Sequence, residues 1–103
     1  MDSINSADMV YIRPILGEVC GPHQTKLLYY RNTHPSWTIR IKVDHHWIYN
    51  GEELHEEKHY VLQPNPTANP GAVSPLDVLM GCPIPGPTMQ TFHWDVVDAV
   101  RVS

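Results

Sequence analysis

The stretch that most constrains the fold is residues 26–43, KLLYYRNTHPSWTIRIKV. Two runs rich in β-branched and aromatic residues flank residues 32–35, a group of turn formers. In the second run Trp37, Ile39, Ile41 and Val43 alternate with polar residues. This period of two is typical of a strand with one buried and one solvated face. The pattern therefore predicts two neighbouring strands and places Trp37 in the core.

A second pair of strands is predicted around Asn50-Gly51, the dipeptide that best fits a two-residue hairpin turn. Such a turn sets Trp47 opposite Leu54, His46 opposite His55, and Asp44 opposite Glu57. Residues 52–62 also fit a short helix, but the turn and the apolar ending Tyr60-Val61-Leu62 favour a return strand.

Further short strands are predicted at residues 10–16, 76–80 and 90–97, with a bridge at 18–20 and an extension at 99–102. Pro14 makes the first of these an edge strand, because proline cannot donate to a ladder. Ten prolines in 103 residues, many of them in loops 63–75 and 81–89, disfavour long helices. We expect residues 1–8 to form a flexible tail and residues 9–103 a single all-β antiparallel sandwich of about seven short strands.

Several of these motifs resemble immunoglobulin-like sandwiches of the major-sperm-protein and pilus-chaperone class. They are a strand ending in Asn32, the alternating WTIRIKV, the segment Tyr60-Val61-Leu62-Gln63-Pro64-Asn65-Pro66, Pro70-Gly71, and a strand at residues 76–80. The similarity covers residues 26–80, and residues 81–87 depart from it. It implies a fold and a habit of binding other proteins through sheet faces and edges, without assigning any site residue.

Composition excludes some classes of function. A net charge of −4 with dispersed acidic residues does not support nucleic-acid binding, and no apolar run is long enough to span a bilayer. There is no nucleophile elbow and no phosphate loop, so we expect a protein without enzymatic activity. The N-terminus lacks signal-peptide order, which favours a cytoplasmic chain or part of a particle released without a signal. In that setting Cys20 and Cys82 are expected to be reduced thiols, although a disulfide is the alternative.

Histidine is the one unusual feature, with four of seven between residues 45 and 59. In the hairpin register His46 and His55 are neighbours on one face, so they could share a divalent ion such as Zn²⁺, Cu²⁺ or Ni²⁺. Asp44 and Glu57 could supply oxygen ligands. The ordinary interpretation of these residues, which we favour, is the solvated face of a hairpin, and a pH-sensitive contact is a further alternative to the metal site. His34 is interpreted as a turn residue with local hydrogen bonds and His93 as structural, with His93 and Asp95 on the outward face of their strand.

The leading hypothesis is a structural or protein-interaction module, a subunit of a larger assembly that binds a protein partner or copies of itself. Stiff proline-rich loops favour recognition surfaces, because they lose little entropy on binding. Trp47, Tyr29 and His59 are the candidate contact residues, Trp47 being the aromatic expected to be most exposed. The alternatives are a metal-binding module and, third, a carbohydrate-binding sandwich that uses Trp47.

Overall fold

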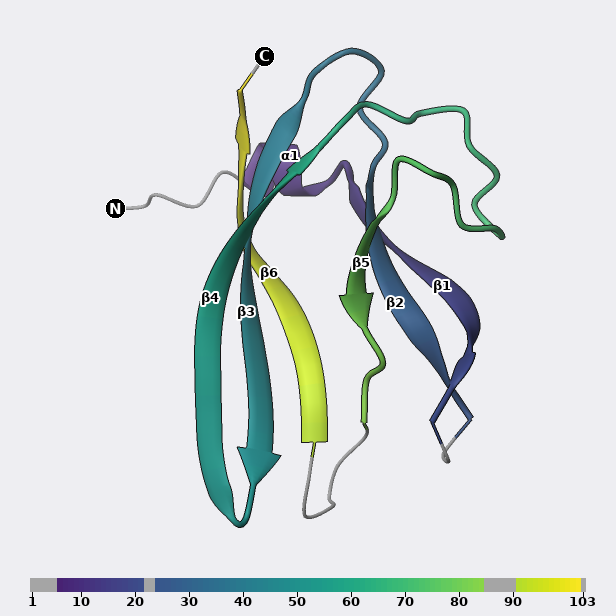
Figure 1. The fold of residues 1–103 in the computed structure, drawn as a ribbon. Coiled ribbons are helices and arrows are strands. Elements are labelled where there is room, and N and C mark those ends of the chain that lie inside the picture. Colours follow the sequence, from purple (N-terminus) through teal and green to yellow (C-terminus); the bar gives the residue numbers. More distant parts are fainter. Residues whose placement is uncertain (1–5, 22–23, 85–90, 103) are drawn as a thin grey trace.

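The computed structural model describes residues 6–21, 24–84 and 91–102. Two three-stranded antiparallel sheets make up most of it (Figure 1). Sheet A has the order β1 (Ile12–Cys20), β2 (Thr25–Asn32), β5 (Val78–Gly81), and sheet B the order β4 (Glu52–Leu62), β3 (Ile39–Tyr49), β6 (Thr91–Arg101). The all-β prediction is confirmed at this level. The predicted number of about seven strands was wrong, because the described residues form six.

The β3–β4 hairpin follows the predicted register over its whole length. Asn50 and Gly51 both have positive φ, 52° and 79°, as a two-residue hairpin turn of this type requires. Trp47 pairs with Leu54, His46 with His55, and Asp44 with Glu57. The choice of a return strand over a helix for residues 52–62 is confirmed.

A core cluster joins the two sheets. Ile39, Ile41 and Val43 are buried along the inner face of β3, and they belong to one cluster with Ile12 and Tyr30 of sheet A. The Tyr30 hydroxyl donates a hydrogen bond of 3.2 Å to the backbone carbonyl of Trp94. Burial, and secondarily the charge of Asp95, raises the pKa of Tyr30, so this donor stays protonated. The cluster fixes which face of sheet B points outward.

The outer face of sheet A is covered by residues 63–77, and Arg31 anchors this segment. The Arg31 side chain is buried and donates both an Nε and an Nη2 hydrogen bond to Asp77, at 2.7 and 2.8 Å. Its remaining donors reach the backbone carbonyls of Ala68, Asn69 and Ala72. Hydrogen bonding to Asp77 raises the pKa of Arg31. Burial alone would raise the pKa of Asp77, but the hydrogen bonds from Arg31 and Ser74 outweigh it and lower that pKa.

The turn between β2 and β3 is held by Asn32 and His34. The Asn32 amide donates to the carbonyls of Trp37 and Leu62 at 2.7 and 3.0 Å. His34 Nδ1 accepts the backbone N–H groups of Ser36 and Trp37, so its prediction as a locally bonded turn residue is confirmed. Trp37 itself was wrongly placed in the core. β3 begins two residues later, at Ile39, and the indole is 42% exposed.

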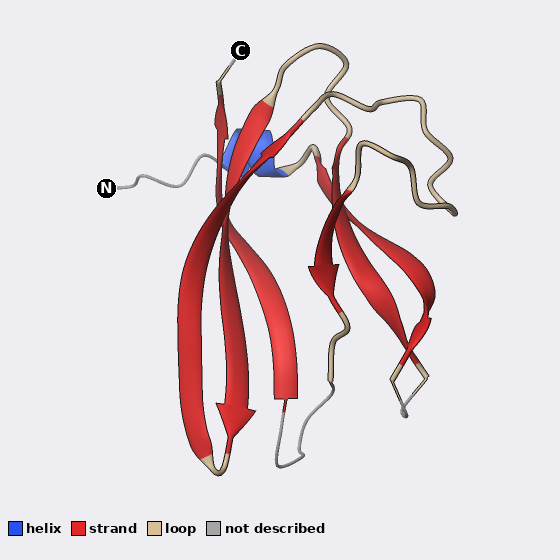
Figure 2. Cartoon of the chain, in the orientation of Figure 1, coloured by secondary structure: helices blue, strands red, loops and turns tan. Residues whose placement is uncertain are grey.

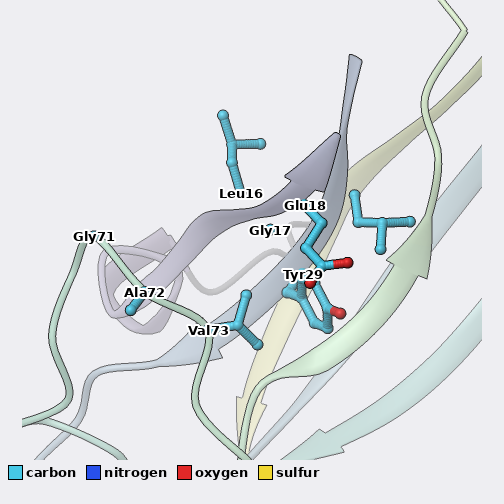
Figure 3. Close-up of a pocket in the computed structure, with 8 residues that line it drawn as sticks. Leu16, Gly17, Glu18, Tyr29, Gly71, Ala72 and Val73 are labelled. Carbon is cyan, nitrogen blue, oxygen red and sulfur yellow. The ribbon is translucent and has the colours of Figure 1, made fainter. Parts of the chain in front are cut away.

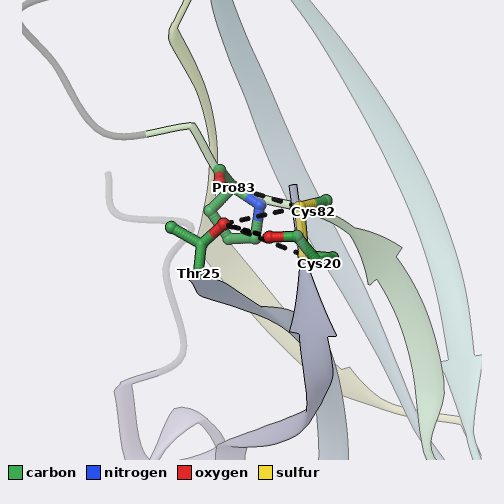
Figure 4. The surroundings of a disulfide bond; sticks show 4 residues. All are labelled: Cys20, Thr25, Cys82 and Pro83. Carbon is green, nitrogen blue, oxygen red and sulfur yellow. Dashed lines mark hydrogen bonds between the residues drawn. A yellow bond between two sulfur atoms is a disulfide. The ribbon is translucent and has the colours of Figure 1, made fainter. Parts of the chain in front are cut away.

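The prediction of reduced cysteines was wrong. Cys20 and Cys82 form a disulfide that joins the end of β1 to the residue after β5, with 62 residues of separation (Figure 4). The Thr25 hydroxyl lies beside it and donates to the carbonyl of Cys20 at 2.9 Å. β1 and β5 flank the same strand, β2, and this arrangement brings the two cysteines together. Their separation in the sequence does not indicate it.

Element boundaries differ from the predictions in three places. β1 starts at Ile12 and runs through an irregularity between Leu16 and Val19, and Pro14 does lie on an edge strand. β5 starts at Val78, which leaves Leu76 in a turn. β6 continues past a bulge at Val97, where the register with β3 shifts.

The one helical element among the described residues is α1 (Ser6–Met9), shown as the short blue turn in Figure 2. Asp8 in α1 is buried and accepts a hydrogen bond of 2.7 Å from Arg101 of β6. Of the expected tail, residues 6–8 therefore lie in this turn, and residues 1–5 fall outside the described part of the chain. A search of the described residues finds no helix with the length and apolar character needed to cross a membrane.

Candidate functional site

The outer face of sheet B carries two polar rows, one residue from each strand in each row. Because β3 pairs with β4 on one side and β6 on the other, His46 has His55 and His93 directly opposite it. The next row along the same face holds Glu57, Asp44 and Asp95, again from β4, β3 and β6. We call these six residues the histidine–carboxylate face, and Figure 1 shows the three strands side by side.

The β6 side of this face is the more compact. The His46 and His93 rings stack with centroids 4.8 Å apart and planes 9° from parallel. The His46 and His55 rings are 5.9 Å apart. Asp95 Oδ2 lies 4.0 Å from His46 Nε2 and 3.8 Å from His93 Nε2. His46, His93 and Asp95 each present one donor atom, and all three atoms lie within 4.8 Å of one another.

Asp44 lies at the centre of the carboxylate row, and only one of its two carboxylate oxygens has a close partner. Its Oδ2 is 2.9 Å from His46 Nε2. Its Oδ1 is shielded from solvent and accepts no hydrogen bond from the described residues, with His55 Nδ1 3.7 Å away. A carboxylate oxygen that is shielded from water and accepts no hydrogen bond destabilises the folded state, because nothing replaces its lost hydration. This oxygen is therefore available to a cation.

The predicted metal ligands divide into two groups. His46 and Asp44 lie together at the centre of the face. His55 and Glu57 share their rows but point into solvent, with the His55 side chain 67% exposed and Glu57 4.0 Å from Lys42 Nζ. His93, interpreted from sequence as structural, and Asp95 take their place. Strand alternation did predict that both face outward, but nothing in the sequence says that β6 lies beside β3.

The predicted contact residues are scattered. Trp47 is on the inner face of sheet B and half-buried, its ring 4.8 Å from that of His45, so it is not the most exposed tryptophan. His59 lies on the outer face opposite Lys42. Tyr29 lies on sheet A, where it pairs with Leu79 of β5.

His45 is packed between two indoles on the inner face of sheet B. Its ring stacks on Trp94 at 4.6 Å with the planes 7° from parallel. Loss of hydration is the largest effect on this imidazole and lowers the pKa of His45, against the opposing charge of Glu56. His45 is thus a partly buried aromatic side chain on the inner face of sheet B and belongs to neither outer face.

Tyr29 lines an open recess of about 480 Å³ between sheet A and the covering segment. Leu16, Gly17 and Glu18 of β1 and Leu27 of β2 form one side, and Gly71 to Val73 form the other (Figure 3). Leu16 and Leu79, next to it, are 56% and 49% exposed. A Cβ at position 17 would lie 2.8 Å from the Tyr29 ring, so glycine is required for the ring to lie this close to β1.

The most exposed tryptophan, Trp37, lies well away from this recess. Its ring is near His34, at 6.5 Å, and under the Arg101 guanidinium, at 5.4 Å. Neither neighbour lines the recess. Trp37 and Arg101 therefore present an apolar ring and a positive charge at the same place on the surface.

The chain matches no protein-family model, no curated protein and no solved structure in the comparisons made. Function therefore has to be argued from these surfaces.

Proposed function

We propose that this chain is a non-catalytic structural module of the immunoglobulin-like sandwich class that assembles with copies of itself. The observation that carries the proposal is the recess beside Tyr29, which has a mixed polar and apolar lining. Leu16 in that lining is exposed, and so is Leu79 on the strand that pairs with Tyr29. Exposed leucines beside a hollow are typical of interaction sites on small proteins. Its volume lies within the usual range for a binding pocket.

The occupant we assign to the recess is Trp37 of a second copy. The indole is the largest exposed aromatic side chain among the described residues, and Arg101 lies over it. The recess offers Leu27 and Val73 for the ring and the exposed Glu18 carboxylate for the guanidinium. Tryptophan and arginine are among the residue types enriched at the energetic hot spots of protein interfaces.

This contact joins two different patches, so it is heterologous. Each copy keeps one free recess and one free Trp37, and a heterologous contact that does not close into a ring grows an open chain of subunits. Such growth suits a subunit of a larger assembly. The disulfide favours an oxidising environment, which agrees better with a released particle than with the cytoplasm.

The test is sedimentation velocity of the chelator-treated chain over a wide concentration range. We expect wild-type protein to form a ladder of oligomers, and Trp37→Ala or Leu79→Arg alone to leave monomers. Mixing the two variants should restore dimers and nothing larger, because one supplies the recess and the other the indole. Val61→Arg is the matched control, since Val61 is 52% exposed but lies on sheet B. It should assemble like wild type.

Monomeric wild-type protein at the highest concentration would overturn the proposal, as would equal disruption by Val61→Arg. A mixture of the two variants that stays monomeric would show that Trp37 does not occupy the recess. The carbohydrate alternative is not carried forward, because Trp47 faces the inside of the fold and packs on His45.

A further inference from the structure

We propose that His46, His93 and Asp95, with Asp44 as the fourth ligand, bind a divalent transition-metal ion of the Zn²⁺ class. The site lies between β3 and β6, and it is independent of the self-association proposed above. It lies along the edge of β3 that pairs with β6, whereas the hairpin alone would predict the edge that pairs with β4.

The donor atoms are of the right kind. Two imidazole nitrogens and two carboxylate oxygens suit Zn²⁺, Cu²⁺ or Ni²⁺, whereas Ca²⁺ and Mg²⁺ prefer oxygen ligands only. Zn²⁺ has no geometric preference from its d electrons, so it tolerates an imperfect tetrahedron best.

The donor atoms are also nearly in place. With metal–ligand bonds of about 2.0–2.1 Å, tetrahedral ligands lie about 3.3 Å from one another. Asp44 Oδ2 and His46 Nε2 are already 2.9 Å apart, and Asp95 Oδ2 is 3.8–4.0 Å from the two imidazoles. Asp44 lies outside the group of three whose donor atoms are within 4.8 Å of one another, and the His46 and His93 rings are parallel. Closing the site therefore requires the exposed His93 and Asp95 side chains to turn toward Asp44 and His46.

The distribution of burial allows those movements. His46 and Asp44 are 26% and 20% exposed and form the fixed floor on the central strand. His93 and Asp95 are 54% and 61% exposed on the neighbouring strand, so their side chains can rotate onto an ion. Strand pairing supplies the rest of the preorganisation, because it fixes the Cα positions of all four residues.

A second observation also points to a cation. Asp44 Oδ1 is shielded from water and accepts no hydrogen bond from the described residues. In the row around it, both flanking residues are carboxylates as well, Glu57 and Asp95. An ion bound by Asp44 would neutralise part of this repulsion, and Oδ1 could share the coordination.

The sheet provides matched controls, because β4 and β6 each present one histidine and one carboxylate on either side of β3. His93→Ala is compared with His55→Ala, and Asp95→Asn with Glu57→Gln. Calorimetric titration with Zn²⁺ should give one site in wild type, lost or weakened by at least about 100-fold in the two β6 variants, since removing even an outer-shell partner costs about 10- to 100-fold. The two β4 variants should change affinity by about twofold, as ordinary surface substitutions do.

Thermal unfolding provides an independent readout. At a hundredfold excess over the dissociation constant, Zn²⁺ should raise the melting temperature of wild type by roughly 10 °C or more. Metal-free unfolding of each variant establishes that it is folded, and His93→Gln serves as a milder replacement if His93→Ala is not.

Three results would overturn the assignment. One is the absence of any Zn²⁺ titration in wild type, another is unchanged binding in His46→Ala, and the third is an equal loss in the β4 variants. The last would move the ion to the β3–β4 hairpin. None of these bears on the sedimentation test, which is performed with chelator present.

Discussion

The outer faces of the two sheets differ in that one is covered by a segment of the chain and the other is open to solvent. On sheet A a fifteen-residue segment, residues 63–77, lies across the strands and is fixed by a buried arginine and its acidic partner. On sheet B histidines and carboxylates stand on the strands with no described segment over them. Covering a face requires every buried polar group to be matched, and Arg31 does this with five hydrogen bonds.

The contrast teaches where to look for ligand chemistry. Arg31 and Asp77 are fully engaged with each other and with backbone groups, so they have little left for a ligand. Asp44 and its neighbours are only partly engaged, and His93 and Asp95 are exposed enough to move. Strong polar bonding on sheet A is therefore structural, and weak polar bonding on sheet B is where a cation can bind.

The largest effect is expected from Arg31→Met. This change removes the cation but leaves Asp77 buried, which for a buried pair costs about 3–5 kcal/mol of unfolding free energy. Chemical denaturation measures the loss, and limited proteolysis should show faster cleavage within residues 63–77. A loss below about 1 kcal/mol, the value expected of a surface pair, would remove the distinction between the two faces. The double variant Arg31→Met/Asp77→Leu should recover part of the stability, because no charge is left unpaired.

Removing the disulfide should come next. Cys20→Ser/Cys82→Ser frees a loop of 62 residues, and losses for such bonds are typically about 2–4 kcal/mol. Denaturation of the variant, and of wild type with and without reductant, gives the size of the effect. The bond ties only sheet A, so hydrogen exchange should accelerate in β1 and β5 more than in the β3–β4 hairpin. Uniform acceleration would contradict this assignment.

These two features also mark the limit of what could be predicted from sequence. Local patterns sufficed for the β3–β4 hairpin, because Asn50-Gly51 sets its turn and the turn sets every pair along it. Pairings between distant segments could not be read in this way. The approach of β6 to β3 moved the candidate site from His55 to His93, and the approach of β5 to β2 joined the cysteines.

The misplacement of Trp37 has a different physical origin. It continues the alternation of Ile39, Ile41 and Val43 by one step, so parity assigned it to the core. The chain leaves the strand geometry before that step, because Asn32 and His34 bind the backbone of the turn. Side-chain hydrogen bonds to the backbone compete with the sheet ladder at such positions, and an alternating pattern carries no record of them.

A smaller effect is expected from the pH dependence of His45. Burial lowers its pKa in the folded state, so stability from the neutral ring is present above the ordinary value of 6.5 and is lost as pH falls through the lowered value. Melting temperature measured below pH 6.5 should therefore fall less steeply in His45→Phe than in wild type. Asp77 loses its contribution only in a more acidic range, below its ordinary value of 3.8. Parallel curves for the two proteins between pH 6.5 and 4 would show that His45 is not titrating in the core.

The smallest effect is expected from the ion pair between Lys42 and Glu57 on sheet B. Its atoms are 4.0 Å apart and its side chains are 35% and 54% exposed, so water competes for both charges. Lys42→Met should change the unfolding free energy by less than about 1 kcal/mol, and the change should shrink further at high salt. The pair is of the same chemical kind as Arg31–Asp77, a cation and a carboxylate on an outer sheet face. If the Lys42–Glu57 pair contributed as much to stability as the Arg31–Asp77 pair, burial under residues 63–77 would not explain the strength of the sheet A pair. The outer face of sheet B would then have a structural role as well.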